Sequence, residues 1–216
     1  MIRMAKSLNK VAITATQMME SMIEAPVPTR AEISDVANAV LDGTDAVMLS
    51  AETATGKYPV ETVTAMAAAC AEADRADRSH TLDAAFLDRT FTRIDQSIAM
   101  AALFAAHHMR ASAIVSLTQS GSTALWVTRI DSGIPVYALT PEESSRRRMT
   151  LFRECHPVAM QYRSYDMPAV LADVERLMLE NGLVKNGDLV VITVGEPVGK
   201  SGGTNNLKIV RIGSHS

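Results

Sequence analysis

Hydroxyl side chains gather where two short apolar runs near the start of the chain give way to polar sequence. Thr16 and Ser21 follow the first run, and Ser50 and Glu52 follow the second. A hydroxyl beside a helix N-terminus can hold an anion, because unpaired backbone N–H groups point to the same place. A hydroxyl and a carboxylate at a strand end can relay a proton. Helix caps and solvated loops that bind nothing use the same residue types, so both interpretations stay open.

A denser cluster follows the apolar run 113–117. It consists of Thr118, Gln119, Ser120, Gly121, Ser122 and Thr123. Its hydroxyls, its flexible glycine and its free amides are typical of a phosphate-binding turn, although a plain Ser/Thr-rich turn has the same composition. No lysine follows as it does in a nucleotide P-loop, so that interpretation fails.

A glycine-rich segment, 195–205, follows a predicted strand near the end of the chain. Its candidate ligand-binding residues are Gly199, Lys200, Ser201, Gly202 and Gly203. Glycine-rich loops between strands often close over ligands, and Lys200 supplies a cation for a phosphate group. In a parallel sheet this loop and the turn at 118–123 lie at the same carboxyl edge. Together they predict a sugar-phosphate site.

Residues with metal-ligating side chains show no spacing typical of a metal site, and we predict none. His107 and His108 are adjacent and therefore point to different faces of a helix. The two cysteines, Cys70 and Cys155, are too few for a disulfide scaffold. We expect both to be buried thiols in a reducing cytosol.

The elements that must position the first two clusters alternate between strands and helices. We expect strands at 11–15 and 45–49, helices at 17–23, 30–42 and 59–75, and a polar loop at 50–58. Thr29 and Glu32 have the spacing of a capping box that starts the second helix. Parallel strand–helix units with polar strand ends are typical of the active rim of a (β/α)8 barrel. Because such a barrel takes about 250 residues, residues 1–76 are predicted to be an incomplete part of one.

A charged linker at 77–94 is predicted to lead into a second unit, residues 95–213. We expect helices at 95–109, 122–130, 142–154 and 168–180, and strands at 113–117, 136–139, 158–162, 188–194 and 207–212. Asp95 is expected to cap the first of these helices. The alternation predicts an α/β fold, namely a three-layer α/β/α sandwich with a mostly parallel five-stranded sheet whose last two strands are antiparallel neighbours.

Composition restricts the function classes. Of the 216 residues, 47% are hydrophobic and 21% are charged, which allows a sizeable core and excludes a wholly disordered chain. A formal net charge of −3 argues against a general nucleic-acid binder. The longest apolar stretch, 98–109, is too short to span a bilayer, and the first residues lack the apolar region of a signal peptide. We expect a cytoplasmic protein that binds neither nucleic acid nor a membrane.

Several motifs together closely resemble the pyruvate kinase family, over essentially the whole chain. They are TATQMMESM at 14–22, PTRAE at 28–32, DVANAV at 35–40, DGTDAVMLSAET at 42–53, the turn at 118–123 and GGTN at 202–205. The resemblance implies that residues 1–76 hold the last two strand–helix units of the family's eightfold barrel. It implies that the remainder is the family's C-terminal regulatory domain.

The family transfers a phosphoryl group from phosphoenolpyruvate to ADP in glycolysis, giving pyruvate and ATP, and it needs Mg²⁺ or Mn²⁺ and usually K⁺. The resemblance implies that Thr16 is catalytic and contacts phosphoenolpyruvate, with Ser50 and Glu52 close to the active centre. The family's catalytic lysine and its metal-binding carboxylates match no stretch of this chain. We therefore expect no phosphotransferase activity from these 216 residues alone.

The resemblance also implies a site for a phosphorylated allosteric effector and a homo-oligomer, commonly a tetramer. The turn at 118–123 is then the holder of one phosphate, and 199–203 is the closing loop. The stretch 162–170 departs from the pattern of members that bind a second phosphate. We therefore expect a hexose or pentose monophosphate, or AMP, rather than fructose 1,6-bisphosphate. The alternative is a stand-alone sugar-phosphate-binding regulatory or oligomerisation module; a regulator unrelated to glycolysis conflicts with the motif at 14–22.

Overall fold

The computed structural model describes residues 1–76 and 90–214, which fall into two compact units, Met1–His80 and Thr81–Ser216. Each unit has a hydrophobic core of its own. Most of the predicted linker at 77–94 lies outside the described residues, so its boundaries stay a prediction.

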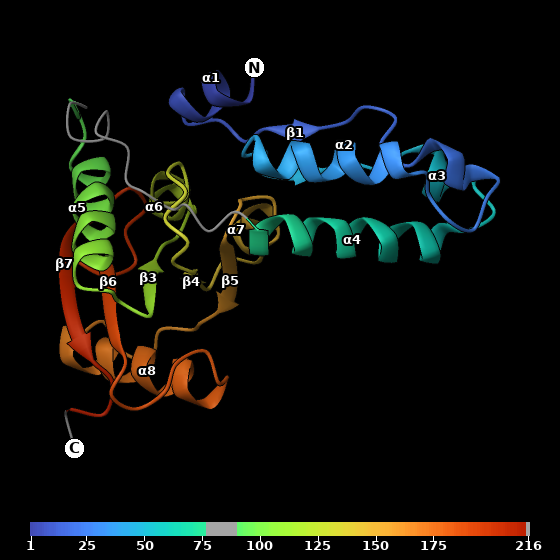
Figure 1. Cartoon of the computed structure of the whole chain (residues 1–216). Coiled ribbons are helices and arrows are strands. Elements are labelled where there is room, and N and C mark those ends of the chain that lie inside the picture. Colours follow the sequence, from blue (N-terminus) through green and yellow to red (C-terminus); the bar gives the residue numbers. More distant parts are fainter. Residues whose placement is uncertain (77–89, 215–216) are drawn as a thin grey trace. The chain divides into compact units, whose positions relative to one another are not determined.

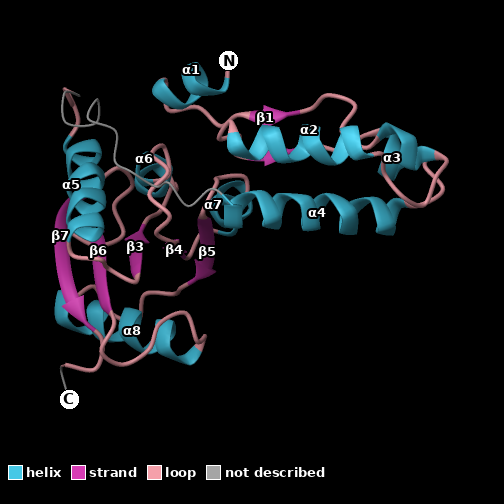
Figure 2. Cartoon of the chain, viewed as in Figure 1, coloured by secondary structure: helices cyan, strands magenta, loops and turns pink. Residues whose placement is uncertain are grey.

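The first unit is built on a small parallel sheet. Its elements are α1 Ile2–Ser7, β1 Ile13–Thr14, the 3₁₀-helix η1 Glu20–Ile23, α2 Arg30–Leu41, β2 Ala46–Val47, α3 Ala51–Ala54 and α4 Pro59–Ala76 (Figures 1 and 2). Strands β1 and β2 pair in parallel, with Ile13 opposite Ala46. Helices α2 and α4 pack against each other. Residues 1–76 hold one pair of parallel strands and form no closed barrel.

The start of α2 confirms the predicted capping box. The Thr29 hydroxyl accepts a hydrogen bond from the N–H of Glu32 at 3.3 Å, and the Glu32 carboxylate accepts one from the N–H of Thr29 at 2.8 Å. The predicted polar loop at 50–58 is partly wrong, because α3 occupies its first half. The predicted helix at 17–23 is reduced to η1. Elements of one turn are too short to show a hydrophobic period, so the sequence pattern does not reveal them.

The second unit contains the larger sheet. Its elements are α5 Ile94–His108, β3 Ala113–Leu117, α6 Ser122–Val127, β4 Val136–Thr140, α7 Glu143–Met149, β5 Cys155–Ala159, α8 Met167–Glu180, β6 Leu189–Gly195 and β7 Thr204–Arg211 (Figure 1). The strand order is β5-β4-β3-β6-β7. The first four of these strands run parallel to one another, and β7 runs antiparallel to β6. The predicted five-stranded, mostly parallel sheet is therefore confirmed.

Helices cover the sheet of the second unit on both faces. Helices α5 and α6 pack against each other on one face, and α7 packs on β4 and β5. Helix α8 lies on the opposite face, where Val174 shares a core with Val115 of β3 and Ile192 of β6. All five positions of β3 are buried, as expected for a central strand covered on both sides. This arrangement is the predicted three-layer sandwich.

Asp95 does not cap α5, contrary to the sequence prediction. The N-cap is Arg93, and Asp95 lies inside the first turn with only 3% of its surface exposed. Its carboxylate accepts hydrogen bonds from Arg93 Nε at 2.9 Å and from Arg93 Nη2 at 2.6 Å. The Arg93 hydrogen bonds lower the pKa of Asp95 against the opposing effect of burial. A buried charge needs a paired cation more than the helix end needs a cap.

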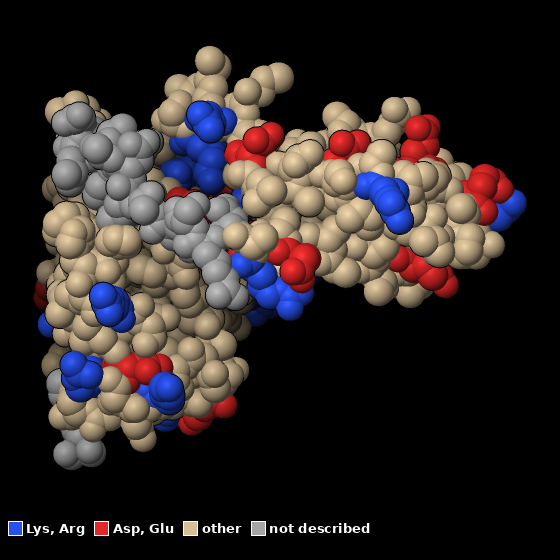
Figure 3. All heavy atoms as spheres, viewed as in Figure 1, with Lys and Arg blue, Asp and Glu red and all other residues tan. Residues whose placement is uncertain are grey.

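Charged side chains of both signs are interspersed on the face shown in Figure 3, and no large patch of Lys and Arg covers it. This distribution agrees with the nearly balanced charge of the sequence. Within the described ranges, no helix combines the length and the apolar character needed to cross a bilayer.

Candidate functional site

The turn between β3 and α6 is held by its own side chains. The Thr118 hydroxyl accepts a hydrogen bond from the N–H of Gly121 at 2.9 Å, and the Ser120 hydroxyl donates to that of Ser122 at 3.2 Å. Gly121 has φ +80°, a conformation that residues other than glycine rarely adopt. The turn therefore has a defined shape with hydroxyl groups concentrated along it.

Two residues at the end of α7 support this turn. A Cβ atom on Gly121 would lie 2.8 Å from Cγ of the fully buried Met149, so the close packing of α7 against the turn requires glycine there. The guanidinium of Arg148 donates to the main-chain oxygen of Ser120. Because that carbonyl is engaged by α7, the orientation of the peptide in the middle of the turn is fixed.

The glycine-rich loop between β6 and β7 has a tightly joined stem. Glu196 donates its N–H to the side-chain oxygen of Asn205 at 2.9 Å, and the Asn205 amide donates to the Glu196 carbonyl at 2.8 Å. Gly195 lies so close to the returning chain that a Cβ atom there would be 2.8 Å from the oxygen of Gly203. Two glycines inside the loop, Gly199 and Gly202, have positive φ. The stem is thus fixed, and glycine allows the left-handed backbone at these two positions of the tip.

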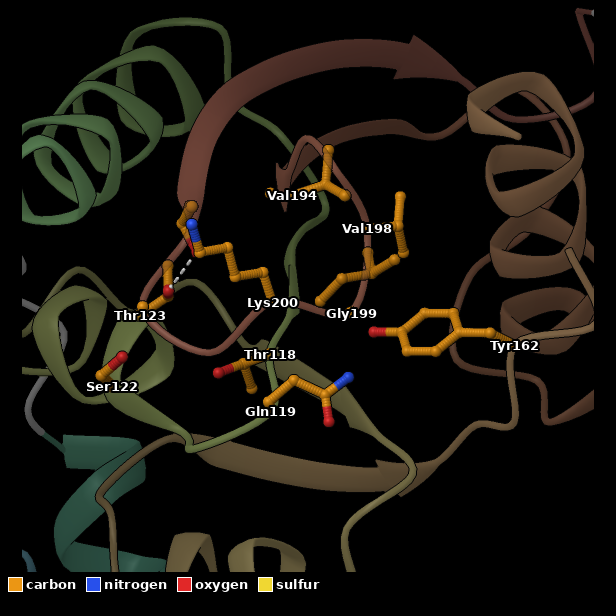
Figure 4. Close-up of a pocket in the computed structure, with 13 residues that line it drawn as sticks. Thr118, Gln119, Ser122, Thr123, Tyr162, Val194, Val198, Gly199 and Lys200 are labelled. Carbon is orange, nitrogen blue, oxygen red and sulfur yellow. Dashed lines mark hydrogen bonds between the residues drawn. The ribbon is translucent and has the colours of Figure 1, made fainter. Parts of the chain in front are cut away.

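The turn and the loop meet in one pocket at the carboxyl edge of the sheet (Figure 4). The hydroxyls of Thr123 and Thr204 form a buried hydrogen bond of 2.7 Å across it, joining α6 to the start of β7. The lining residues are Leu117, Thr118, Gln119, Ser122, Thr123, Tyr162, Val194, Gly195, Val198, Gly199, Lys200, Gly202 and Thr204. The prediction that the turn and the loop lie at the same edge is confirmed; their role in binding stays a prediction.

The predicted residues divide into two groups. Those that line the pocket are Thr118, Gln119, Ser122, Thr123, Gly199, Lys200 and Gly202. Four others, Ser120, Gly121, Ser201 and Gly203, belong to the same turn and loop but are not among the lining residues. Ser120 and Gly121 contribute instead to the internal hydrogen bonds of the turn.

Several lining residues were not predicted from the sequence. Thr204 belongs to the GGTN motif, and its place one residue after the loop glycines is a usable signal. Tyr162 follows β5, which ends at Ala159 because its partner β4 ends at Thr140. The predicted strand at 158–162 is therefore wrong in its second half, and Tyr162 leaves the sheet to face the pocket. No local pattern reveals that position.

The pocket supplies hydroxyls, amides and a single cation. Among the residues that line it, Lys200 alone carries a formal charge. The Thr123 and Thr204 hydroxyls share one hydrogen bond, so one of their two O–H groups still has a proton to donate. In this conformation the cavity has a volume of about 10 Å³, which is room for about one water molecule. A larger ligand therefore requires residues of the lining to move apart.

The catalytic candidates of the first unit lie around the segment that follows β1. Thr16 is exposed, and its hydroxyl contacts the sulfur of Met18 at 3.4 Å. Ser50 is also exposed, at the N-cap of α3. Glu52 is 4% exposed, and its carboxylate accepts the N–H of Met19 at 3.3 Å and that of Ser50 at 2.8 Å. Glu52 thereby connects both predicted hydroxyl segments.

The surroundings of Glu52 keep its carboxylate ionised. Burial alone would raise its pKa, but the backbone N–H groups of Glu52 itself, Ser50 and Met19 outweigh burial and lower the pKa. A carboxylate with both oxygens occupied by backbone donors is a poor proton carrier and a good backbone anchor. The two exposed hydroxyls, Thr16 and Ser50, are the groups among these candidates that are open to a substrate.

The part of the chain that the structure describes contains no cluster of side chains suited to bind a divalent cation. No group of three or more His, Cys, Asp or Glu side chains there has an arrangement that fits a metal ion. We assign no step to a metal held by these residues.

Comparisons with known proteins agree with the motifs. A family model described as "Pyruvate kinase, alpha/beta domain" matches residues 96–210, and a second, "Pyruvate kinase, barrel domain", matches residues 1–63. A pyruvate kinase of Buchnera aphidicola is 47% identical over 215 residues, and pyruvate kinase II of Salmonella typhimurium is 45% identical over 213. Both alignments cover 98% of this chain and 44% of the relative.

A solved structure shows the same fold. The crystal structure of a pyruvate kinase from Cryptosporidium parvum matches with a TM-score of 0.85 and 31% identity, over 98% of this chain and 42% of that one. The chain thus spans about 44% of the length of the curated relatives it matches. The alpha/beta-domain family alone matches more than half of the chain. On these grounds, the chain belongs to the pyruvate kinase family.

Proposed function

We propose that the protein to which these residues belong transfers the phosphoryl group of phosphoenolpyruvate to ADP, giving pyruvate and ATP. The observation that carries the proposal is the 47% identity to a pyruvate kinase over 215 residues, which includes the motif around Thr16. In this proposal Thr16 contacts phosphoenolpyruvate, and Ser50 lies beside the active centre. Glu52 fixes the backbone that presents them. Mg²⁺ or Mn²⁺, and K⁺, serve the whole enzyme and neutralise charge on the transferring group.

An assay of the purified 216-residue chain tests whether these residues alone have phosphotransferase activity. With phosphoenolpyruvate, ADP, Mg²⁺ and K⁺, we expect no pyruvate formation above background in a lactate dehydrogenase-coupled assay, because no lysine or carboxylate cluster here matches the family's catalytic set. Metal-dependent activity of these residues alone would refute that expectation. Sequencing the gene on its 5′ side tests the whole-protein proposal. An in-frame lysine and metal-binding carboxylates support it, and an immediate in-frame stop codon counts against it.

We further propose that the pocket of the second unit binds the phosphate group of an allosteric effector. The turn at 118–123 and the loop at 199–203 hold a single phosphate. A hexose or pentose monophosphate, or AMP, is preferred to a bisphosphate, since Lys200 is the lone formal charge in the lining. Calorimetry of the purified chain with glucose 6-phosphate, ribose 5-phosphate, AMP and fructose 1,6-bisphosphate tests the proposal.

Two lysine substitutions, one inside the pocket and one outside it, give that experiment a test and a matched control. Lys200→Ala is expected to weaken binding of the best monophosphate about tenfold or more, because a charge-assisted contact contributes about 1.5–3 kcal/mol. Lys208→Ala removes an exposed lysine of β7 that does not line this pocket, and it is expected to leave binding unchanged. Equal effects of the two substitutions would contradict the assignment.

A second candidate function is a stand-alone sugar-phosphate-binding regulatory or oligomerisation module. Two observations favour it: the second unit has a hydrophobic core of its own, and all residues that line the pocket belong to that unit. For either function we propose that the protein forms a homo-oligomer, namely a tetramer. Light scattering of the purified chain measures its molar mass and hence the number of subunits. A cytoplasmic location is supported by the two free thiols, Cys70 and Cys155.

A further inference from the structure

The pocket has two chemically different ends. The hydroxyls of Thr118, Ser122 and Thr123 lie toward one end, and the Thr204 hydroxyl joins them through its hydrogen bond with Thr123. Tyr162 approaches from the other end, and its hydroxyl points toward Gly199 and the centre of the pocket (Figure 4). This second end carries no formal charge on any lining residue. A ligand that spans the pocket therefore meets phosphate-binding chemistry on one side and a neutral phenol on the other.

Tyr162 is held in place from several directions. Its ring packs against the core beneath α8, and the side chain of Gln119 lines the same pocket beside its hydroxyl (Figure 4). The ring of Tyr165 lies beside it, with centroids 6.0 Å apart. Tyr165 in turn lies against the loop, because a Cβ atom on Gly199 would be 3.1 Å from its ring. The Tyr162 hydroxyl is thus positioned where the turn, the loop and the aromatic pair meet.

The Tyr162 hydroxyl stays protonated over the ordinary pH range. Burial is the main cause that raises its pKa, and nearby Tyr165 adds to the rise, while the neighbouring Gln119 side chain acts in the opposite direction. A protonated phenol both donates and accepts, and so does the Gln119 amide. Such a pair matches the hydroxyl groups of a sugar. A phosphate dianion placed there would lose hydration without gaining a cation in return.

We propose that Tyr162 is the specificity-determining residue of this pocket, where it hydrogen-bonds with the uncharged hydroxyl end of a phosphorylated sugar and excludes a second phosphate. The proposal rests on the effector-binding function proposed above. It adds the residue that distinguishes a sugar monophosphate from inorganic phosphate on one side and from a bisphosphate on the other.

Calorimetry of the full 216-residue chain tests the proposal with three probes: inorganic phosphate, glucose 6-phosphate and fructose 1,6-bisphosphate. The wild type is expected to bind glucose 6-phosphate most tightly. Tyr162→Phe keeps the ring and removes one hydroxyl, and it is expected to weaken glucose 6-phosphate about tenfold while changing inorganic phosphate less than about twofold. Tyr137→Phe, on β4 and outside the lining of the pocket, is the matched control, and no change is expected.

A gain-of-function variant makes the test independent of lost stability. Tyr162→Arg supplies a cation at the neutral end, and we expect fructose 1,6-bisphosphate to bind at least about tenfold more tightly than to the wild type. Thermal midpoints check that each variant is folded. Unchanged glucose 6-phosphate affinity in Tyr162→Phe overturns the role of Tyr162 alone. A wild type that prefers the bisphosphate overturns both that role and the monophosphate preference proposed above. Failure of all three probes to bind the wild type overturns the effector site itself and this inference with it.

Discussion

Single glycines decide where the chain around the pocket can turn. Gly121 combines a positive φ with direct packing against Met149. Gly182, just after α8, also has a positive φ, but a Cβ atom added there would meet nothing within 4 Å. Glycine is therefore required at position 121 for two reasons, namely the positive φ and the close contact with Met149. At position 182 it is required for the positive φ alone.

Gly121→Ala is expected to destabilise the second unit by about 2–4 kcal/mol. About 1–2 kcal/mol comes from the left-handed backbone, and the rest comes from the collision with buried Met149. Gly182→Ala, as the control, is expected to cost only the backbone contribution. Urea unfolding followed by the fluorescence of Trp126, the single tryptophan of the chain, measures both. Equal losses in the two variants would show that Met149 gives way without cost.

Residue types predict the chemistry of a site better than its complete membership. The turn at 118–123 and Lys200 were identifiable because hydroxyls, glycines and a lysine stand together in the sequence. Tyr162 was not, because it reaches the pocket only after β5 ends where β4 ends. Asp95 misled the prediction for a similar reason. Its type fits a cap, but its burial is a tertiary property.

Carboxylates connect the short elements of the first unit to one another. Glu32, at the start of α2, accepts hydrogen bonds from the N–H of Ser21 at 2.7 Å and from its hydroxyl at 2.5 Å, in addition to those of the capping box. Glu52 joins α3 to the residue before η1. Elements of one turn have little stability of their own, so these side chains supply what secondary structure does not.

Glu32→Gln is expected to lower the stability of the first unit by about 1–2 kcal/mol at pH 7, because charge-assisted hydrogen bonds become neutral ones. Burial opposes ionisation, but the Ser21 and Thr29 hydrogen bonds outweigh it and lower the pKa of Glu32 below 4.5. The stabilisation is therefore complete above about pH 4.5 and is lost as the pH falls through the lowered value. Far-UV circular dichroism during urea unfolding measures it.

Glu61→Gln, at the exposed start of α4, is the control for this variant. We expect a change below about 0.5 kcal/mol at either pH. The difference between wild type and Glu32→Gln should shrink as the pH is lowered from 7 toward 3. A difference that stays constant with pH would mean that the Glu32 charge contributes nothing.

The two units differ in how well they bury their apolar residues. The core of the second unit extends from β3 and β6 across to α8, whereas that of the first consists mainly of Met18, Met19 and Met22 with parts of α2 and α4. Exposed apolar side chains are frequent in the first unit, among them Val60 at 73% and Val63 at 52% of their surface. Its sheet has two strands of two residues each. Less apolar burial means less stability per residue.

The first unit is accordingly expected to unfold before the second. Trp126 reports on the second unit alone, while circular dichroism reports on both. In urea we expect ellipticity to fall in two phases, with the fluorescence change confined to the later one. Amide hydrogen exchange should be faster in 1–76 than in 95–213. Glucose 6-phosphate at about 100 times its Kd should raise the later transition by about 2.7 kcal/mol and leave the earlier one unchanged. A single transition seen equally by both probes, with equal protection of both segments, would show that the two units fold as one cooperative body.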